Sequence, residues 1–349
     1  MTLVDGPEVI TWTAGKQDGG TRLDLAVASI VPGCTRNTAA RLIKKGLALV
    51  NDSAKKPGYR LVPGDTVKVA VSMKEKSRRL AAEPLDVDIV FQDLSVIVIN
   101  KPAGLVVHPA AGNFSGTLAH GLIYHFPELR NVCAEPERPG IIHRLDKDTS
   151  GIMVIARNSD SLKNLSLQFK TRSVYKTYIA FVHGNPDSDE GTIASPISRH
   201  PVHRKKMTAD AGDPEKARHA QTSWRVAERY GTFAMLECSI KTGRTHQIRV
   251  HLSSIGYPVI GDQVYGYKNP RRLYKTDPEA ADLASGARRQ MLHAAEIAFT
   301  HPETGKYVRF TASMPDDMTG LRKALLKHSG RQTGFPQNPP TVQGHDPVF

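Results

Sequence analysis

The chain has 349 residues, of which 40% are hydrophobic and 23% are charged, and its lysines and arginines give it a formal net charge of +13. This composition is typical of a soluble globular protein of about two domains, and no apolar run approaches the roughly 20 residues of a membrane-spanning helix. Three widely spaced cysteines exclude a disulfide framework and a structural zinc site. The first residues also lack the features of a secretory signal, so we expect a cytoplasmic protein.

The N-terminal quarter is predicted to contain a loose extension followed by a small folded unit. Residues 1–19 are polar and rich in glycine, which predicts an extension, and the folded unit covers residues 20–73. A first helix begins at Leu23, and Thr35 can cap a second helix that ends at Gly46. The strands predicted after these helices span residues 47–52 and 66–71.

Positive charge is concentrated in this part of the chain. Residues 1–79 contain 14 lysines and arginines against 7 acidic residues, an excess of 7. Lysine and arginine displace counterions from nucleic-acid phosphates, so the unit suits RNA, although basic proteins are also often basic for solubility. The side chains expected to contact RNA here are Arg22, Arg36, Arg41, Lys44 and Lys45.

After a charged linker over residues 74–84, residues 85–328 are predicted to form a second domain. Its strand-like segments do not alternate regularly with helices, which favours an α+β fold with a mixed, largely antiparallel sheet over a doubly wound fold. The predicted segments are strands at 89–91, 96–99 and 175–183, a helix at 159–172, and a hairpin of 295–300 with 307–311. Residues 329–349 contain many prolines, glycines and glutamines, and we expect a disordered tail there.

A charged loop at residues 143–151 lies between two short apolar segments, Ile141-Ile142 and residues 152–155. Both segments are predicted to be buried strands, which would hold the loop still. The alternative is a surface turn whose charges pair with one another, and composition does not decide between the two. The loop offers two carboxylates, Asp146 and Asp148, and either is ionised at neutral pH without help from a base.

Two further polar residues lie in segments of regular structure. Tyr178 belongs to the strand over 175–183, where core packing is the ordinary role of a tyrosine. Arg249 falls early in a helix that Thr245 caps and Gly256 ends, and it lies off the predicted core face. The predicted buried stripe of this helix consists of Ile248, Leu252 and Ile255.

The sequence offers no obvious cofactor site. The histidines, His108, His143 and His246 among them, match no spacing that ligates a metal. Glycine-rich phosphate loops are absent from the sequence as well. We therefore expect neither a metal nor a nucleotide cofactor.

Three segments in chain order, residues 143–151, 176–180 and 243–252, resemble the active-site, tyrosine and arginine motifs of the RluA-type pseudouridine synthases. The resemblance implies an enzyme that isomerises uridine to pseudouridine in RNA, with a central active-site cleft in its second domain. When the bond from N1 of uracil to C1′ breaks, C1′ becomes electron-poor, and a carboxylate can stabilise or capture it. The motif assigns this role to Asp146 and leaves Asp148 structural, bonding backbone amides of its turn.

The same resemblance implies roles for other residues. The tyrosine that matches Tyr178 stacks on the target base and takes a proton during isomerisation, and the arginine that matches Arg249 pairs with the catalytic aspartate. Arg144 corresponds to the residue that fills the gap left by an extruded base. The other residues expected to contact RNA are His108, His143, Arg204 and His246.

The N-terminal unit resembles the S4 RNA-binding domain in its Arg22-Leu23-Asp24 opening and its turn at 61–65. Segments 106–113 and 199–207 resemble the RluD branch of the synthase family. That resemblance implies a monomer acting on a stem-loop of large-subunit rRNA, either free or in a pre-ribosomal or assembled subunit, with other rRNA or tRNA sites as alternatives. A non-catalytic ribosome-assembly factor would explain the charge without needing the three motifs. A glycoside hydrolase would need paired carboxylates and an aromatic sugar cleft.

Overall fold

The computed structural model describes residues 8–31, 34, 36–71, 80–110, 112–132, 137–203, 206–209 and 217–330. The chain divides into two compact units, one of Met1–Glu83 with Leu122–Pro139 and the other of Pro84–Gly121 with Gly140–Phe349. None of the helices within the described ranges is both long and apolar enough to cross a membrane.

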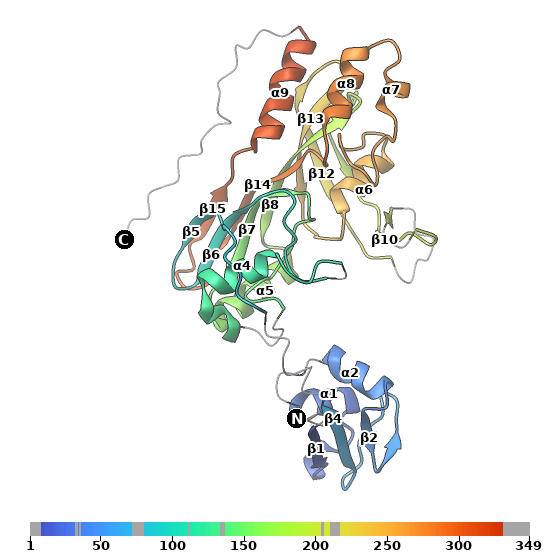
Figure 1. Cartoon of the computed structure of the whole chain (residues 1–349), viewed down its shortest axis with the longest axis vertical. Coiled ribbons are helices and arrows are strands. Elements are labelled where there is room, and N and C mark those ends of the chain that lie inside the picture. Colours follow the sequence, from blue (N-terminus) through green and yellow to red (C-terminus); the bar gives the residue numbers. More distant parts are fainter. Residues whose placement is uncertain are drawn as a thin grey trace, which may run out of the picture. The chain divides into compact units, whose positions relative to one another are not determined.

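The N-terminal part of the first unit, over the described residues from 8 to 71, contains a four-stranded antiparallel sheet and two α-helices (Figure 1). Its elements are β1 (Glu8–Thr13), a 3-10 helix (Lys16–Asp18), α1 (Leu23–Ile30), α2 (Arg36–Lys44), β2 (Ala48–Val50), β3 (Ser53–Ala54) and β4 (Thr66–Val71). The strand order is β1-β4-β2-β3. The predicted helix pair and the two predicted strands are therefore confirmed, while the Thr35 cap lies outside the described residues.

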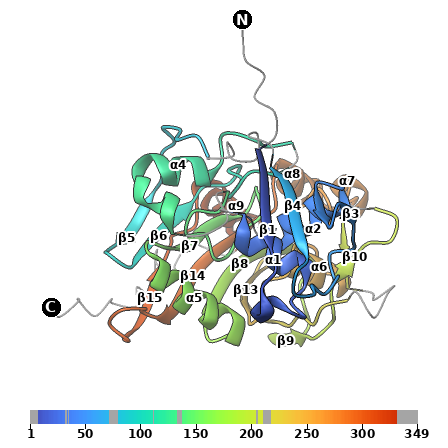
Figure 2. The same ribbon diagram turned by 90° about the horizontal axis from the view of Figure 1, so that it is seen from below.

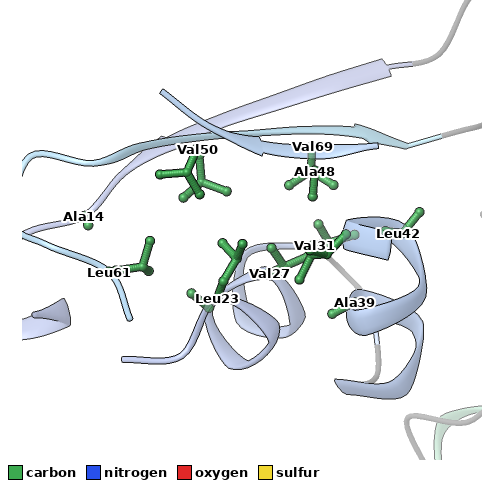
Figure 3. Packing of buried hydrophobic residues seen from close by; sticks show 13 residues of the cluster. Ala14, Leu23, Val27, Val31, Ala39, Leu42, Ala48, Val50, Leu61 and Val69 are labelled. Atoms are coloured by element: carbon green, nitrogen blue, oxygen red, sulfur yellow. The ribbon is translucent and has the colours of Figure 1, made fainter. Parts of the chain in front are cut away.

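The core of this unit lies between the sheet and the helix pair (Figure 3). Val67 and Val69 alternate along β4 and are fully buried, as the two-residue period of a strand requires. Side chains of β2 and β4 face those of α1 and α2 across the core in the close-up. The residues labelled there are Ala14, Leu23, Val27, Val31, Ala39, Leu42, Ala48, Val50, Leu61 and Val69.

The prediction that the N-terminal 19 residues are loose is wrong for β1. This strand pairs with β4 along its whole length, from Glu8 opposite Val71 to Thr13 opposite Thr66, and the two strands lie side by side in Figure 2. Its residues, Glu-Val-Ile-Thr-Trp-Thr, are mostly β-branched or aromatic and favour a strand. The glycine content on both sides of this segment concealed that signal.

The remaining elements follow in chain order. They are β5 (Ile89–Gln92), β6 (Val96–Lys101), α4 (Leu118–His125), a 3-10 helix (Pro127–Asn131), β7 (Ser150–Ala156), α5 (Ser159–Thr171), β8 (Tyr175–His183), β9 (Glu190–Ile193), β10 (Ser198–Arg199), β11 (Met207–Thr208), β12 (Thr222–Arg229), β13 (Phe233–Ile240), α6 (Gln247–Ser254), α7 (Pro270–Leu273), α8 (Pro278–Gly286), β14 (Leu292–Thr300), β15 (Tyr307–Thr311) and α9 (Asp316–His328).

One nine-stranded sheet organises the second unit. Its order is β5-β6-β7-β14-β8-β13-β12-β9, and β15 pairs with β14. Neighbouring strands run antiparallel, except that β14 pairs in parallel with β7. Strand β14, late in the chain, therefore lies between β7 and β8 (Figure 1). The predicted α+β fold with a mixed, largely antiparallel sheet is confirmed.

Some local predictions need correction. Ile141 and Ile142 do not form a strand, because Ile141 makes only an isolated bridge to Ile155. No element was predicted for residues 268–286, and this stretch contains the short helices α7 and α8. The predicted linker and tail fall largely on residues 72–79 and 331–349, which lie outside the described residues.

Strand β7 fixes the end of the charged loop at residues 143–149. Gly151 has a φ of +119° and pairs with Ala294 of β14, so closely that a Cβ on Gly151 would lie 2.2 Å from the Ala294 carbonyl oxygen. Only glycine permits this approach. Beside it, the Ser150 hydroxyl bonds His293 Nδ1 at 2.9 Å. The loop thus leaves the sheet from a point that two central strands hold.

Candidate active site

Three side chains from separate segments form a chain of charges at the loop. Arg249 of α6 donates from Nη1 to Asp146 Oδ2 at 2.8 Å. The same guanidinium donates from Nε and Nη2 to the two carboxylate oxygens of Asp262, at 2.6 and 2.9 Å. Asp262 Oδ1 also accepts the backbone N–H groups of Val264 and Tyr265. Asp262 therefore fixes the guanidinium, and the guanidinium orients Asp146.

Burial separates the roles of these charges. The side chain of Asp262 is fully buried, that of Arg249 is 6% exposed, and that of Asp146 is 20% exposed. Burial opposes the charge on Arg249, but its bonds and attraction to Asp262 and Asp146 raise its pKa above the usual value. Burial likewise opposes the charge on Asp262, yet Arg249 and the two amides lower its pKa. Both groups stay ionised at neutral pH, and Asp146 is the most exposed of the three side chains.

Helix α6 differs from its prediction in two respects. Its N-cap is His246, with a left-handed φ of 57°, rather than Thr245. All residues from Gln247 to Leu252 are buried, so this part of the helix has no solvent face, and Arg249 lies inside the protein. Ile255, predicted to be buried, is 37% exposed. The apolar stripe could not show that polar residues of the helix are buried too.

Tyr178 of β8 and Asp146 line the same cavity, of about 90 Å³. The tyrosine is 8% exposed. Burial raises the pKa of its phenol well above the usual range, and the negative charge of Asp146 raises it further. The phenol is therefore neutral and presents an apolar ring beside a carboxylate. Leu145, Thr149, Ile240 and Leu292 add to the lining, together with residues 243–249.

Lys101, which the sequence analysis did not select, also holds the charged loop in place. The buried Lys101 ammonium donates to the carbonyl oxygens of Pro102, Leu105 and Lys147, at 2.8, 2.9 and 3.0 Å. Burial lowers the pKa of Lys101 to about 7, against the opposing attraction of Asp148 and Asp146. These bonds tie the loop to the end of β6.

Asp148 does not have the bonding that was predicted for its carboxylate. The Thr149 amide donates to the backbone carbonyl of Asp146, at 3.1 Å. Asp148 takes part through its own carbonyl, which accepts from Arg289 Nη1 at 3.1 Å. A backbone bond and the Arg289 side chain thus hold the turn, and no backbone amide of the described residues donates to the Asp148 carboxylate.

Asp262 and Tyr265 are also residues that the sequence analysis did not select. The Tyr265 ring lies 5.3 Å from the Arg249 guanidinium carbon, and its hydroxyl bonds His246 Nδ1 at 2.9 Å. His246 Nε2 lies 4.0 Å from Asp146 Oδ1. Burial lowers the pKa of His246, although the charge of Asp146 opposes this. An acidic residue two positions after the apolar stretch 258–260 was the available signal.

The other predicted contact residues occupy different environments. Arg144 is exposed and lines the cavity beside Tyr178. His143 accepts the Val154 N–H at Nε2 and stacks on Phe169, with ring centroids 4.9 Å apart. His108 is buried. Arg204 lies outside the described residues. No cluster of three or more His, Cys, Asp or Glu within the described part of the chain could hold a metal ion.

Comparison with known proteins identifies the family. The family described as RNA pseudouridylate synthase matches residues 95–254, and the S4 domain matches residues 21–67. The ribosomal large subunit pseudouridine synthase D of Neisseria meningitidis serogroup A is 42% identical over 313 residues, which cover 89% of this chain and 80% of that protein. The chain belongs to the RNA pseudouridine synthase family. It is thus an enzyme that isomerises uridine in RNA.

Other comparisons agree with this membership. An uncharacterized RNA pseudouridine synthase of Bacillus subtilis, YlyB, is 40% identical over 316 residues, which cover 90% of this chain and 98% of YlyB. The solved structure titled human RNA pseudouridylate synthase domain containing 4 is 27% identical, with a TM-score of 0.53. The match covers 68% of the present chain and 92% of the human one. The family match spans the loop, β8 and α6, and it ends before Asp262.

The S4-domain cations that were expected to contact RNA fall into two groups. Asp24 accepts bonds from Arg22, at 2.8 and 3.0 Å, and from Arg36, at 3.2 Å. The bond from Arg22 lowers the pKa of Asp24 to about 2, although burial opposes the shift. Arg36 therefore helps to hold α2 against α1, whereas Arg22 bonds within the first turn of α1. The second group, at the C-terminal end of α2, is exposed and consists of Arg41, Lys44 and Lys45.

Replacing this exposed group by Arg41→Gln, Lys44→Gln and Lys45→Gln should weaken RNA binding and its dependence on salt. Each phosphate that the variant no longer neutralises should reduce the slope of log affinity against log salt by about 0.7 to 0.9. The measurement is a salt titration of RNA affinity. A matched variant with glutamine at the exposed Lys163, Lys306 and Lys323 serves as the control. Equal slopes in both variants would show that α2 binds no RNA phosphates.

Proposed function

We propose that the synthase isomerises uridine in a stem-loop of large-subunit rRNA and that Asp146 acts at C1′ of the target nucleotide. The observation that carries the catalytic assignment is the Asp146–Arg249 ion pair, which lines the same cavity as Tyr178. The names of relatives that are 42% and 39% identical, both ribosomal large subunit pseudouridine synthase D, support the substrate.

The reaction begins with cleavage of the bond from N1 to C1′. The electron pair leaves with the uracil, and C1′ becomes electron-poor, so an ionised carboxylate can stabilise it or form a bond with it. The detached uracil turns within the cavity, and C5 bonds to C1′, which breaks any bond that C1′ has formed with the carboxylate. C5 then loses its proton, and N1 gains one. Arg249 orients the Asp146 carboxylate, because Asp262 holds the guanidinium in one orientation.

Tyr178 and Arg144 are proposed to hold the RNA around this step. The neutral Tyr178 ring suits stacking on the target base, and the raised pKa of its phenol makes a phenolate base scarce at neutral pH. The exposed Arg144 guanidinium, at the mouth of the cavity, suits the space left in the RNA when the uridine is extruded. Extrusion costs least where stacking is weak, which favours a uridine in or beside a loop.

We further propose that the synthase works as a monomer in the cytoplasm during ribosome formation. Its substrate there is rRNA, either free or in a pre-ribosomal or assembled subunit. The S4 domain supplies a second basic surface on α2, which suits a large structured RNA more than a short one. A purely RNA-binding role in assembly would leave the Asp146–Arg249–Asp262 chain without a use.

Pseudouridine mapping in cells that lack the synthase tests the substrate. We expect pseudouridine to be lost from one or more stem-loop positions of large-subunit rRNA, and to return when the unaltered enzyme is supplied. Complementation with the Asp146→Asn variant is the matched control and should restore nothing. Loss confined to tRNA would overturn the rRNA assignment and leave the reaction type standing.

A further inference from the structure

A basic groove of about 450 Å³ adjoins the catalytic cavity. The two share Arg144, Tyr178, Ile240, Gly243 and Arg244, so the groove is continuous with the place where the target base would lie. The basic groove is lined by residues 142–144, Phe169, Lys170, Arg172, Lys176, Tyr178 and 240–244. Its cations come from the loop, the end of α5, β8 and the segment after β13.

No aspartate or glutamate belongs to the described lining of this groove. The effect of so many like charges is visible at Arg244. Burial lowers the pKa of its guanidinium, and the charges of Arg218 and Arg172 lower it further. Such a concentration of positive charge is unfavourable in the free protein and favours an anion in the groove.

Lys176 distinguishes this groove from an ordinary basic surface. Lys176 is only 8% exposed. Among the described residues its ammonium has no carboxylate partner and lies over the Phe169 ring, 5.5 Å from the ring centroid. Burial lowers the pKa of Lys176 to about 8. Burial lowers the pKa of the adjacent His143 to about 3, and the charge of Lys176 contributes, so this imidazole is neutral. A buried ammonium without a carboxylate is costly, and a bound anion would offset the cost.

We infer that the groove binds an internucleotide phosphate next to the target uridine, with Lys176 as its buried ligand. The inference deepens the proposed function, because it relies on the target base lying against Tyr178. Lys176 and Tyr178 are two residues apart on β8 and therefore project to the same side of the sheet. A nucleotide whose base lies at Tyr178 brings its flanking phosphodiester to the lysine.

This assignment explains why the cation is buried rather than exposed. A phosphate held by surface lysines tolerates many positions, whereas one held by a fixed, desolvated ammonium has a single position. A fixed phosphate sets the ribose of the target nucleotide relative to Asp146. Lys176 is thus a positioning residue in the reaction, and it binds the RNA backbone without reading the base.

The test is a double-substitution cycle between the protein and the RNA. All proteins carry Asp146→Asn, so affinity is measured without turnover, and the RNA is one that the unaltered synthase has been shown to convert. A neutral methylphosphonate replaces the phosphate on the 5′ or the 3′ side of the target uridine. Lys176→Met and one of these two replacements should each weaken binding about tenfold to a hundredfold. Together they should weaken it little more than either alone.

Stability separates this role from a structural one. Because the ammonium is desolvated without a carboxylate, Lys176→Met should leave the thermal stability of the RNA-free protein unchanged or raise it. Lys163→Met, on the exposed side of α5, is the matched control and should leave the penalties of both methylphosphonates unchanged. If Lys176→Met does not fold, Lys176→Gln takes its place.

Additive penalties at both linkages would overturn the inference, and so would a marked loss of stability with unchanged RNA affinity. Failure of the proposed function is a separate result. In that case the unaltered enzyme converts no rRNA stem-loop, and the cycle is run on whichever RNA it does convert.

Discussion

Asp146→Asn should abolish pseudouridine formation, with a loss on the order of 10⁴-fold or more under single-turnover conditions. The substitution removes one negative charge at nearly constant shape, so C1′ loses the group that stabilises or captures it. RNA affinity and folding should be nearly unchanged, because the side chain is partly exposed and Arg249 keeps its two bonds to Asp262. Pseudouridine mapping of the product RNA measures the effect.

Asp148→Asn is the matched control for this result. The two aspartates lie in the same loop, but the Asp148 carboxylate is not part of the lining of the catalytic cavity. This variant should retain most of its activity. An active Asp146→Asn enzyme alongside an inactive Asp148→Asn enzyme would show that the nucleophile has been assigned to the wrong residue.

Arg249→Met should inactivate the synthase and also destabilise it by about 3–5 kcal/mol, because it leaves the buried carboxylate of Asp262 without its partner. Loss of activity alone would therefore not distinguish a catalytic defect from partial unfolding. Thermal or denaturant unfolding gives the stability change, and turnover is compared at a temperature at which the variant is fully folded.

The double variant Arg249→Met with Asp262→Asn separates the two effects. Asparagine keeps an oxygen for the amides of Val264 and Tyr265 while removing the unpaired charge. Much of the lost stability should return, but activity should not, since Asp146 still lacks its guanidinium. Recovery of activity together with stability would mean that the ion pair is structural and that Asp146 acts without it.

The predicted elements that the structure confirms have short-range signals. Strand β8, Tyr175–His183, has the bounds that were predicted, and the hairpin of β14 and β15 turns between residues 300 and 307, as predicted. Each of these patterns is contained in a few neighbouring residues. The three motifs likewise selected Asp146, Tyr178 and Arg249 as candidate residues of one site from the sequence alone. The structure brings these three residues to one cavity.

The features that could not be predicted from the sequence depend on contacts between distant residues. Neither the parallel pairing of β14 with β7 nor the burial of Lys101 by loop carbonyls leaves a periodic trace in sequence. Asp262 lies 13 residues beyond Arg249 and belongs to no motif that was considered. Arg249 was placed off the core face because an apolar stripe indicates one buried face and says nothing about polar residues that are buried elsewhere on the helix.

The position of β14 between β7 and β8 has a consequence for synthesis of the enzyme. The ribosome must complete residues 292–300 before these two strands can acquire their shared neighbour, although β7 and β8 themselves emerge more than a hundred residues earlier. Such long-range pairing is slow, and it comes late in folding. A nascent chain that already contains Asp146, Tyr178 and Arg249 therefore still lacks the strand that anchors its loop. Catalytic competence therefore requires that synthesis has passed residue 300.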